Sequence, residues 1–144
     1  PNLTKHVKMI SKLRRKENMK LFKCNHCGNV VEKIVDSGVG VVCCGEPMVE
    51  LTANTTDAAL EKHVPVLSID GDILTAKVGE VAHPMTKEHL ITTIIAVLGN
   101  KVMRVDLTDA DEPVATFALG GYKGTVEVYE YCNLHGLWKA EIEA

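Results

Sequence analysis

Four cysteines early in the chain are spaced to bind one metal ion. Cys24 and Cys27 form a C-x-x-C pair, which fifteen residues separate from the adjacent cysteines Cys43 and Cys44. Four thiolates suit a tetrahedral zinc or iron centre, and the spacing alone favours zinc because it is the commoner structural metal in such sites. A disulfide between adjacent cysteines would be strained. Because adjacent ligands cannot both take the usual knuckle geometry, we expect a distorted tetrahedron.

A second group combines histidines with the remaining cysteine. Cys132 and His135 are three residues apart and can turn both side chains toward one ion, and three further histidines, His63, His83 and His89, lie upstream. Imidazole suits iron, copper and zinc, and a thiolate adds electron density to the site. Five ligands leave one octahedral position open, which suits iron that binds and reduces a small oxygen species. The sequence therefore predicts a second metal site.

The composition agrees with thiols that serve metal or redox chemistry. The chain has 144 residues, 46% of them hydrophobic and only 4% aromatic, so we expect one or two small domains with an aliphatic core. Its longest apolar run, residues 94–98, is far too short to cross a membrane. No small-residue cleavage site follows an apolar stretch near the N-terminus, so we expect a cytoplasmic protein. In that compartment free thiols are commoner than disulfides.

The charge is distributed unevenly along the chain. Residues 1–23 hold eight basic side chains and one acid, a net +7, which leaves −10 on the remainder of a chain whose formal charge is −3. A basic arm can bind nucleic acid or a membrane surface. A short basic run by itself is weak evidence for either, so we interpret residues 1–19 as a solvated basic extension and expect no nucleic-acid or membrane partner.

The two candidate metal sites fall in separate parts of the chain. Small and polar residues at 52–60 indicate a linker between a small module at 20–51 and a larger one at 61–144. The small module is too short to bury enough surface by itself, so we expect a metal or a partner chain to stabilise it.

The larger module has the pattern of an antiparallel β-sandwich. Alternating apolar residues and intervening turn residues predict strands at 64–70, 73–78, 90–98, 101–107, 115–119, 125–131 and 138–142. The segment 90–98 would also fit a helix by periodicity, but its threonines and isoleucines favour a strand. Loops at one end of such a sandwich can bring the histidines and Cys132 together.

The residues around both sites resemble the desulfoferrodoxin family over about residues 20–144. The small module carries the strings Cys24-Asn25-His26-Cys27-Gly28-Asn29-Val30-Val31-Glu32 and Val42-Cys43-Cys44-Gly45-Glu46-Pro47-Met48. The larger one carries Glu61-Lys62-His63-Val64-Pro65-Val66, Val81-Ala82-His83-Pro84-Met85, His89 and Tyr131-Cys132-Asn133-Leu134-His135-Gly136-Leu137-Trp138.

The resemblance implies a desulforedoxin-like domain followed by an immunoglobulin-like β-sandwich. It further implies two iron ions per chain: one held by Cys24, Cys27, Cys43 and Cys44, the other by His63, His83, His89, His135 and Cys132. The implied activity is the one-electron reduction of superoxide to hydrogen peroxide. The family also implies a rubredoxin-like electron donor and a homodimer.

The same resemblance gives roles to two charged residues before His63. Lys62 would attract the superoxide anion and help to deliver protons, and Glu61 would occupy the open iron position in the ferric resting state. The alternative is an exposed charge pair without function, which the match of the whole string from Glu61 to Pro65 disfavours. Two other functions remain open on the residues alone: an electron-transfer iron protein that does not react with superoxide, and a zinc-binding interaction module.

Overall fold

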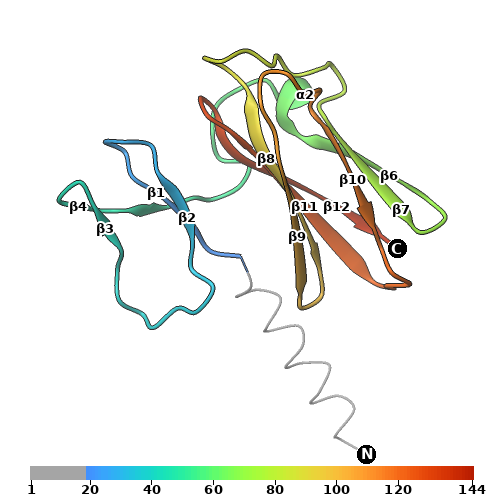
Figure 1. Ribbon diagram of the computed structural model, residues 1–144, viewed down its shortest axis with the longest axis horizontal. Coiled ribbons are helices and arrows are strands. Elements are labelled where there is room, and N and C mark those ends of the chain that lie inside the picture. The colour runs from blue at the N-terminus through green and yellow to red at the C-terminus, as the bar shows by residue number, and fades with distance from the viewer. Residues whose placement is uncertain (1–18) are drawn as a thin grey trace, which may run out of the picture. The chain divides into compact units, whose positions relative to one another are not determined.

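The computed structural model describes residues 19–144 and divides the chain into two compact units, the first ending at Thr52 and the second comprising Ala53–Ala144. Residues 1–18, which make up nearly all of the predicted basic extension, lie outside the described residues. Both units are built from antiparallel strands (Figure 1). Within residues 19–144, no helix is long and apolar enough to cross a membrane.

The N-terminal unit consists of very short strands joined by turns. A three-stranded sheet has the order β2-β1-β5, and β3 pairs with β4 in a separate hairpin. The strands are β1 (Leu21–Lys23), β2 (Val30–Glu32), β3 (Val42–Cys43), β4 (Glu46–Pro47) and β5 (Val49–Glu50). Among its described residues only Leu21, Cys24 and Met48 are buried. So small a core cannot stabilise the unit alone, which leaves that task to the cysteine site or a partner.

The C-terminal unit is an immunoglobulin-like sandwich of two antiparallel sheets (Figure 1). One sheet has the order β10-β7-β6 and the other the order β12-β11-β8-β9. The elements are α2 (Leu60–His63), β6 (Pro65–Asp70), β7 (Ile73–Val78), β8 (Ile91–Leu98), β9 (Lys101–Asp106), β10 (Val114–Ala118), β11 (Thr125–Cys132) and β12 (Gly136–Glu143). The mostly β fold predicted from the sequence is therefore confirmed.

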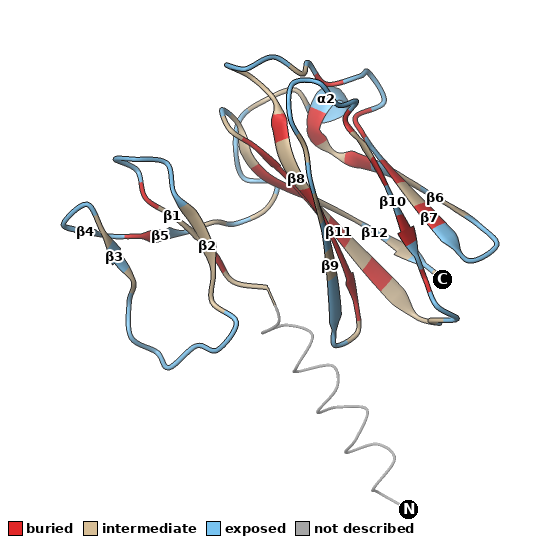
Figure 2. Ribbon diagram, in the orientation of Figure 1, coloured by how far each residue is buried: buried red, intermediate tan, exposed pale blue. Residues whose placement is uncertain are grey.

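The core lies between the two sheets and follows from the side-chain alternation of the strands. In β7 the inward positions are Leu74, Ala76 and Val78, none of which is exposed. Strand β8 is buried along most of its length because it lies inside its sheet, between β11 and β9. Figure 2 shows the buried residues on the strands of both sheets. This rigid framework sets where the loops at each end begin.

All seven predicted strands are present, with ends displaced by at most two residues. Strand β12 begins at Gly136 instead of Trp138 because its ladder with β11 continues to the Cys132–Gly136 pair that closes the hairpin. The segment 90–98 is a strand, as its β-branched residues predicted. The four-residue helix α2 was not predicted, because one helical turn is too short to produce a periodic pattern.

The segment that leads into α2 is fastened to the edge of the larger sheet. Asn54 has a positive φ of 62° and donates its backbone N–H to the carbonyl of Leu137 over 3.0 Å. Its side chain donates to the carbonyl of Lys139 at 3.2 Å and accepts the N–H of Lys139 at 2.9 Å. These bonds cover the start of edge strand β12 and fix the path of the chain toward His63.

Candidate metal centres

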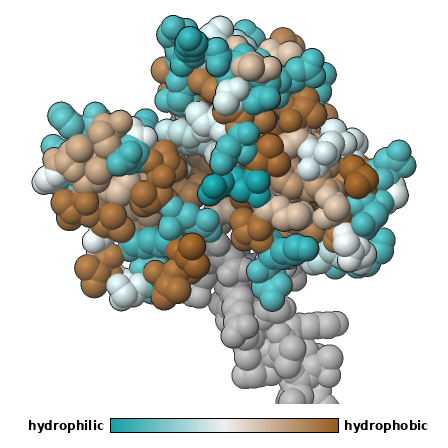
Figure 3. All heavy atoms as spheres, in the orientation of Figure 1, coloured by the Kyte–Doolittle hydropathy of each residue, from teal (hydrophilic) through white to brown (hydrophobic). Residues whose placement is uncertain are grey.

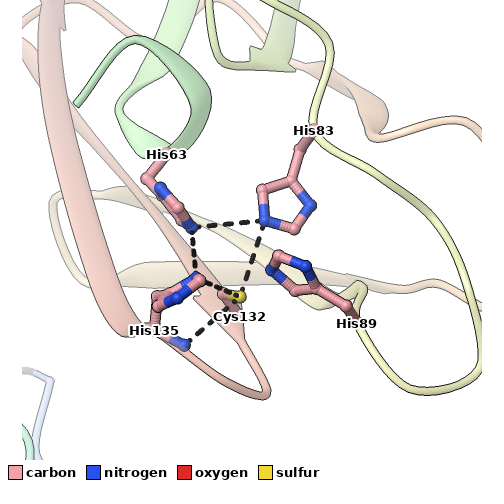
Figure 4. A group of neighbouring side chains, drawn as sticks. All are labelled: His63, His83, His89, Cys132 and His135. Atoms are coloured by element: carbon pink, nitrogen blue, oxygen red, sulfur yellow. Dashed lines mark hydrogen bonds between the residues drawn. The ribbon is translucent and has the colours of Figure 1, made fainter. Parts of the chain in front are cut away.

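Five side chains converge at one end of the sandwich, as Figure 4 shows. His63 ends α2, His83 and His89 lie between β7 and β8, Cys132 ends β11, and His135 lies in the β11–β12 turn. Their ligand atoms all lie within 4.8 Å of one another. The loops of the sandwich therefore bring all five predicted ligands of the second site together.

The distances within this group are those of side chains facing a common point. His63 Nε2 lies 3.1 Å from His135 Nδ1 and 3.3 Å from His83 Nε2. Cys132 Sγ lies 3.5 Å from His83 Nε2 and 3.8 Å from His135 Nδ1. A shared ion would give each of these lone pairs a partner.

Backbone carbonyls select the ring nitrogens of two histidines that face the group. His63 Nδ1 donates to the carbonyl of Ala59 at 2.7 Å, and His83 Nδ1 donates to that of Pro84 at 2.7 Å. A carbonyl only accepts hydrogen bonds, so Nδ1 carries the proton in both rings and Nε2 presents its lone pair. In metal sites, a hydrogen bond from one ring nitrogen commonly orients a histidine whose other ring nitrogen binds the metal.

Burial keeps these imidazoles neutral. It lowers the pKa of His63 and His89 and, against the opposing bond to Pro84, lowers the pKa of His83 to about 4. Burial also raises the pKa of the Cys132 thiol, which accepts the N–H of His135 at 3.4 Å. His89 Nε2 is buried and lacks a hydrogen-bond partner within residues 19–144. Neutral imidazoles with facing lone pairs and one unpartnered nitrogen fit a bound metal cation.

Asn133 ties together the two segments that carry four of these ligands. Its Oδ1 accepts the N–H of Leu90 at 3.0 Å, and its Nδ2 donates to the carbonyl of Glu88 at 2.9 Å. The β7–β8 connection that carries His89 is thereby held against the turn that carries Cys132 and His135. No role was predicted for Asn133 from the sequence, although its place between Cys132 and His135 was a signal.

Gly79 allows the β7–β8 connection to approach α2. A Cβ atom there would lie 2.5 Å from the carbonyl oxygen of Val81 and 2.7 Å from that of Glu61, and φ is +82°. Without this side chain, Val81 N–H donates to Glu61 O at 3.0 Å. Only glycine both adopts this positive φ readily and leaves room for the two carbonyl oxygens. Gly79 therefore fixes the contact with the turn that carries Glu61, Lys62 and His63.

Glu61 and Lys62 lie on α2 beside the histidine group, and both are exposed. Neither forms an ion pair with a residue that the structure describes. The positive charge of Lys62 lowers the pKa of His63 and His89, and the negative charge of Glu61 raises that of His63. The charge on Lys62 therefore acts on the group without being neutralised by a salt bridge.

The four cysteines of the N-terminal unit form the other group, with sulfur atoms within 4.8 Å of one another. Cys27 Sγ lies 3.6 Å from Cys43 Sγ, which lies 4.0 Å from Cys44 Sγ. The adjacent pair is accommodated by left-handed backbone at Cys44 (φ 53°) and Gly45 (φ 75°). None of the five cysteines in the chain forms a disulfide. Four converging thiols fit a tetrathiolate metal site.

Hydrogen bonds and neighbouring thiols set unequal proton affinities in this group. The backbone N–H of Cys27 lowers the pKa of Cys24 to about 6. Hydrogen bonds with Cys27 and Cys24 raise the pKa of Cys44 to about 12. The first thiol therefore ionises readily and the last does so only when a cation compensates its charge. His26, inside the first turn, is exposed and takes no part in the group.

Family models match both units. The model described as "Desulfoferrodoxin" covers residues 55–141, and the model of the desulfoferrodoxin N-terminal domain covers residues 16–51. The chain belongs to the desulfoferrodoxin family. A desulfoferrodoxin from Syntrophotalea carbinolica is 48% identical over 126 residues, which span 87% of this chain and 98% of that protein.

Solved structures of superoxide reductases resemble this member of the family. The enzyme from Treponema pallidum has a TM-score of 0.69 and 35% identity, covering 85% of this chain and 98% of its own. The one-iron enzyme from Giardia intestinalis has a TM-score of 0.51 and 34% identity, covering 58% of this chain and 99% of its own. The two donor groups fit the two iron ions of desulfoferrodoxins, one tetrathiolate and one with four histidines and a cysteine. Iron thus replaces the zinc that cysteine spacing alone had favoured.

Proposed function

We propose that this chain is a superoxide reductase, which converts superoxide to hydrogen peroxide by adding one electron and two protons. The observation that carries the proposal is the convergence of four imidazoles and one thiol at one end of the sandwich, with all ligand atoms within 4.8 Å. The likeness to the superoxide reductase of Treponema pallidum supports it.

The proposed ligands of the reactive iron are His63, His83, His89, His135 and Cys132, and those of the second iron are Cys24, Cys27, Cys43 and Cys44. Ferrous iron held by the first set would supply the electron that superoxide takes up. Five donors are one fewer than octahedral iron accepts, which leaves a place for a small anion. The thiolate of Cys132 would donate electron density to the site and make the iron more electron-rich than imidazoles alone would.

Lys62 and Glu61 act on the anion from the protein side. The exposed ammonium of Lys62 attracts superoxide toward the histidine group and delivers protons through water. Its effect on the pKa values of His63 and His89 supports this assignment, because the same positive charge would act on a bound anion. Glu61 would provide a carboxylate for the open position in the ferric resting state, and its charge already acts on His63.

The deciding experiment mixes the reduced, iron-loaded protein with superoxide and measures both products. A reductase forms one hydrogen peroxide per superoxide consumed and evolves no oxygen beyond spontaneous dismutation. Catalytic oxygen evolution would contradict the proposal. An electron-transfer protein would hold iron at both sites and show no fast reaction, and a zinc module would be colourless.

We also propose that the chain works in the cytoplasm as a homodimer and receives electrons from a rubredoxin-like protein. The five free cysteines are typical of a reducing compartment.

The N-terminal unit has few buried residues, and Ile34 and Val35 are 89% and 87% exposed. Hydrophobic residues are visible on the surface of this unit (Figure 3), where a second copy would cover them. Sedimentation equilibrium tests the dimer, and stopped-flow reduction by rubredoxin tests the donor.

A further inference from the structure

One residue of the N-terminal unit donates hydrogen bonds to sulfurs from both halves of the four-cysteine group. The backbone N–H of Asn29 lies 3.5 Å from Cys27 Sγ, and its side-chain Nδ2 lies 3.6 Å from Cys43 Sγ. Asn29 also accepts the backbone N–H of Cys24 through its carbonyl oxygen at 2.9 Å. It therefore contacts the first C-x-x-C turn through its backbone and the adjacent pair through its side chain.

The bond to Cys43 differs in kind from the other donations to sulfur. Cys24 Sγ and Cys27 Sγ accept backbone N–H groups, which any residue except proline supplies. The N–H donor to Cys43 Sγ is a side chain, so it depends on the identity of residue 29. A thiolate only accepts hydrogen bonds, so the amide must face it with its NH₂ group.

We infer that the Asn29 side chain raises the reduction potential of the tetrathiolate iron site. Gaining an electron takes iron from ferric to ferrous and increases the net negative charge of the centre from −1 to −2. A hydrogen bond to a ligand sulfur stabilises that added charge and so favours the reduced form. Asn29 acts through Cys43 and is therefore a tuning residue, not a ligand.

The position of Asn29 allows this effect to be separated from a structural one. Asn29 is exposed, and its side chain forms no other hydrogen bond with residues 19–144. Truncating this exposed side chain removes one N–H···S bond. Asn25 lies in the same turn, is also exposed, and makes no side-chain contact with a sulfur in the described part of the chain. Asn25→Ala is the matched control.

The test is a redox titration of the iron-loaded protein, followed through the visible absorption of each centre. Asn29→Ala should shift the oxidised-to-reduced ratio of the tetrathiolate iron toward the oxidised form by about threefold to tenfold, the usual worth of one hydrogen bond. A tenfold shift is about 59 mV for a one-electron couple. Asn29→Asp keeps the shape of the side chain, replaces the donor with a negative charge, and should shift the ratio further in the same direction.

One control variant and one internal reference accompany this titration. Asn25→Ala should leave the potential unchanged, and the histidine-ligated iron of the same molecule is an internal reference that should not move in any variant. An unchanged tetrathiolate potential in Asn29→Ala and Asn29→Asp would overturn the inference. Loss of iron from this site in both variants would also overturn it, since Asn29 would then be structural. Neither the reduction potential nor the iron content of this site depends on superoxide reduction. A failure of this inference can therefore be distinguished from a failure of the proposed function.

Discussion

The indole ring of Trp138 stacks on the imidazole ring of His63, with ring centroids 5.0 Å apart and planes 25° apart. Trp138 is fully buried, and its Nε1–H donates to the backbone carbonyl of His135 at 3.1 Å. One side chain on β12 therefore restrains two predicted ligands that are 72 residues apart in sequence. Supports of this kind orient metal ligands and contribute to metal affinity.

Replacing Trp138 should weaken iron binding at the histidine site. Trp138→Phe keeps a ring against His63 but removes the bond to His135, so we expect about 1 kcal/mol lower stability and roughly tenfold weaker ferrous iron binding. Trp138→Leu removes both contacts and should weaken binding further. Competition with a chelator of known affinity measures the effect.

Phe117→Leu is the matched control for this change. Phe117 is buried in β10 and pairs with Leu74, at the end of β7 away from α2. It should lower the free energy of unfolding by about 1–3 kcal/mol without changing iron affinity. Equal losses of iron affinity in Phe117→Leu and Trp138→Leu would show that Trp138 acts only through the stability of the core and has no specific role in supporting the ligands.

Asn133→Ala should displace His89 from the histidine group. The change removes the two bonds that hold the β7–β8 connection to the Cys132–His135 turn. We expect iron affinity to fall by about 10-fold to 100-fold, the usual cost of losing a support of metal ligands. Asp72→Ala provides the comparison, because Asp72 also makes two side-chain bonds to the backbone, yet those bonds join the β6–β7 turn to Gly120 and Gly121. It should destabilise the unit and leave iron affinity intact; the reverse result would contradict the role of Asn133.

The predicted ligands could be found from the sequence because their chemistry is distinctive. Cysteines and histidines are the soft and borderline ligands of proteins, so their types and spacing alone pointed to two sites. The strands were predictable for a similar reason, since alternation of apolar residues depends on local sequence. Asn133, Trp138 and Asn29 are ordinary residue types whose roles arise only from contacts with distant segments. Their positions inside the family strings marked them as relevant and gave no indication of which atoms they contact.

Lys62→Ala should slow the reaction with superoxide and flatten its dependence on salt. The variant removes an exposed positive charge beside His63, and we expect about a threefold to tenfold lower rate constant at low ionic strength. Raising the salt concentration should narrow the difference from the native protein because charges are screened. Stopped-flow measurement or pulse radiolysis at several ionic strengths gives both quantities.

Lys101→Ala is the control for charge as such. Lys101 is exposed at the start of β9, opposite Leu98, and so lies at the end of the sandwich away from Cys132. Lys101→Ala should change the rate constant and its dependence on salt much less than Lys62→Ala does. If both variants behave alike, Lys62 contributes only to net charge.

Glu130 should make the C-terminal unit less stable as the pH rises. The residue is fully buried, neither carboxyl oxygen has a partner among the described residues, and burial raises its pKa to about 9. The folded chain therefore retains a proton that the unfolded chain releases above its ordinary pKa of 4.5. Between these values the free energy of unfolding should fall by about 1.4 kcal/mol per pH unit.

Glu130→Gln should abolish this slope, because an amide does not titrate. Urea unfolding of the metal-free protein between pH 7 and 8.5 measures the slope, at pH values above those at which the buried His63, His83 and His89 titrate, because burial lowers their pKa. The single tryptophan, Trp138, reports on the correct unit. Glu141→Gln removes a half-exposed carboxylate from β12 and should keep the slope. A native protein whose stability is flat over this range would show that Glu130 is not protonated in the folded state.

Removing iron should unfold the N-terminal unit before the sandwich. The buried core of that unit within the described residues is Leu21, Cys24 and Met48, and one of the three is a proposed iron ligand. The sandwich, by contrast, has a continuous core of strands from both sheets. Metal binding to so small a unit supplies much of its folding free energy.

Hydrogen exchange after chelation should therefore show lost protection at residues 21–50 and retained protection in β7, β8 and β11. Cys44→Ser should give the same pattern without a chelator, whereas Cys132→Ser should leave residues 21–50 protected. Protection at 21–50 that survives loss of the iron would mean that a partner chain, not the metal, stabilises this unit.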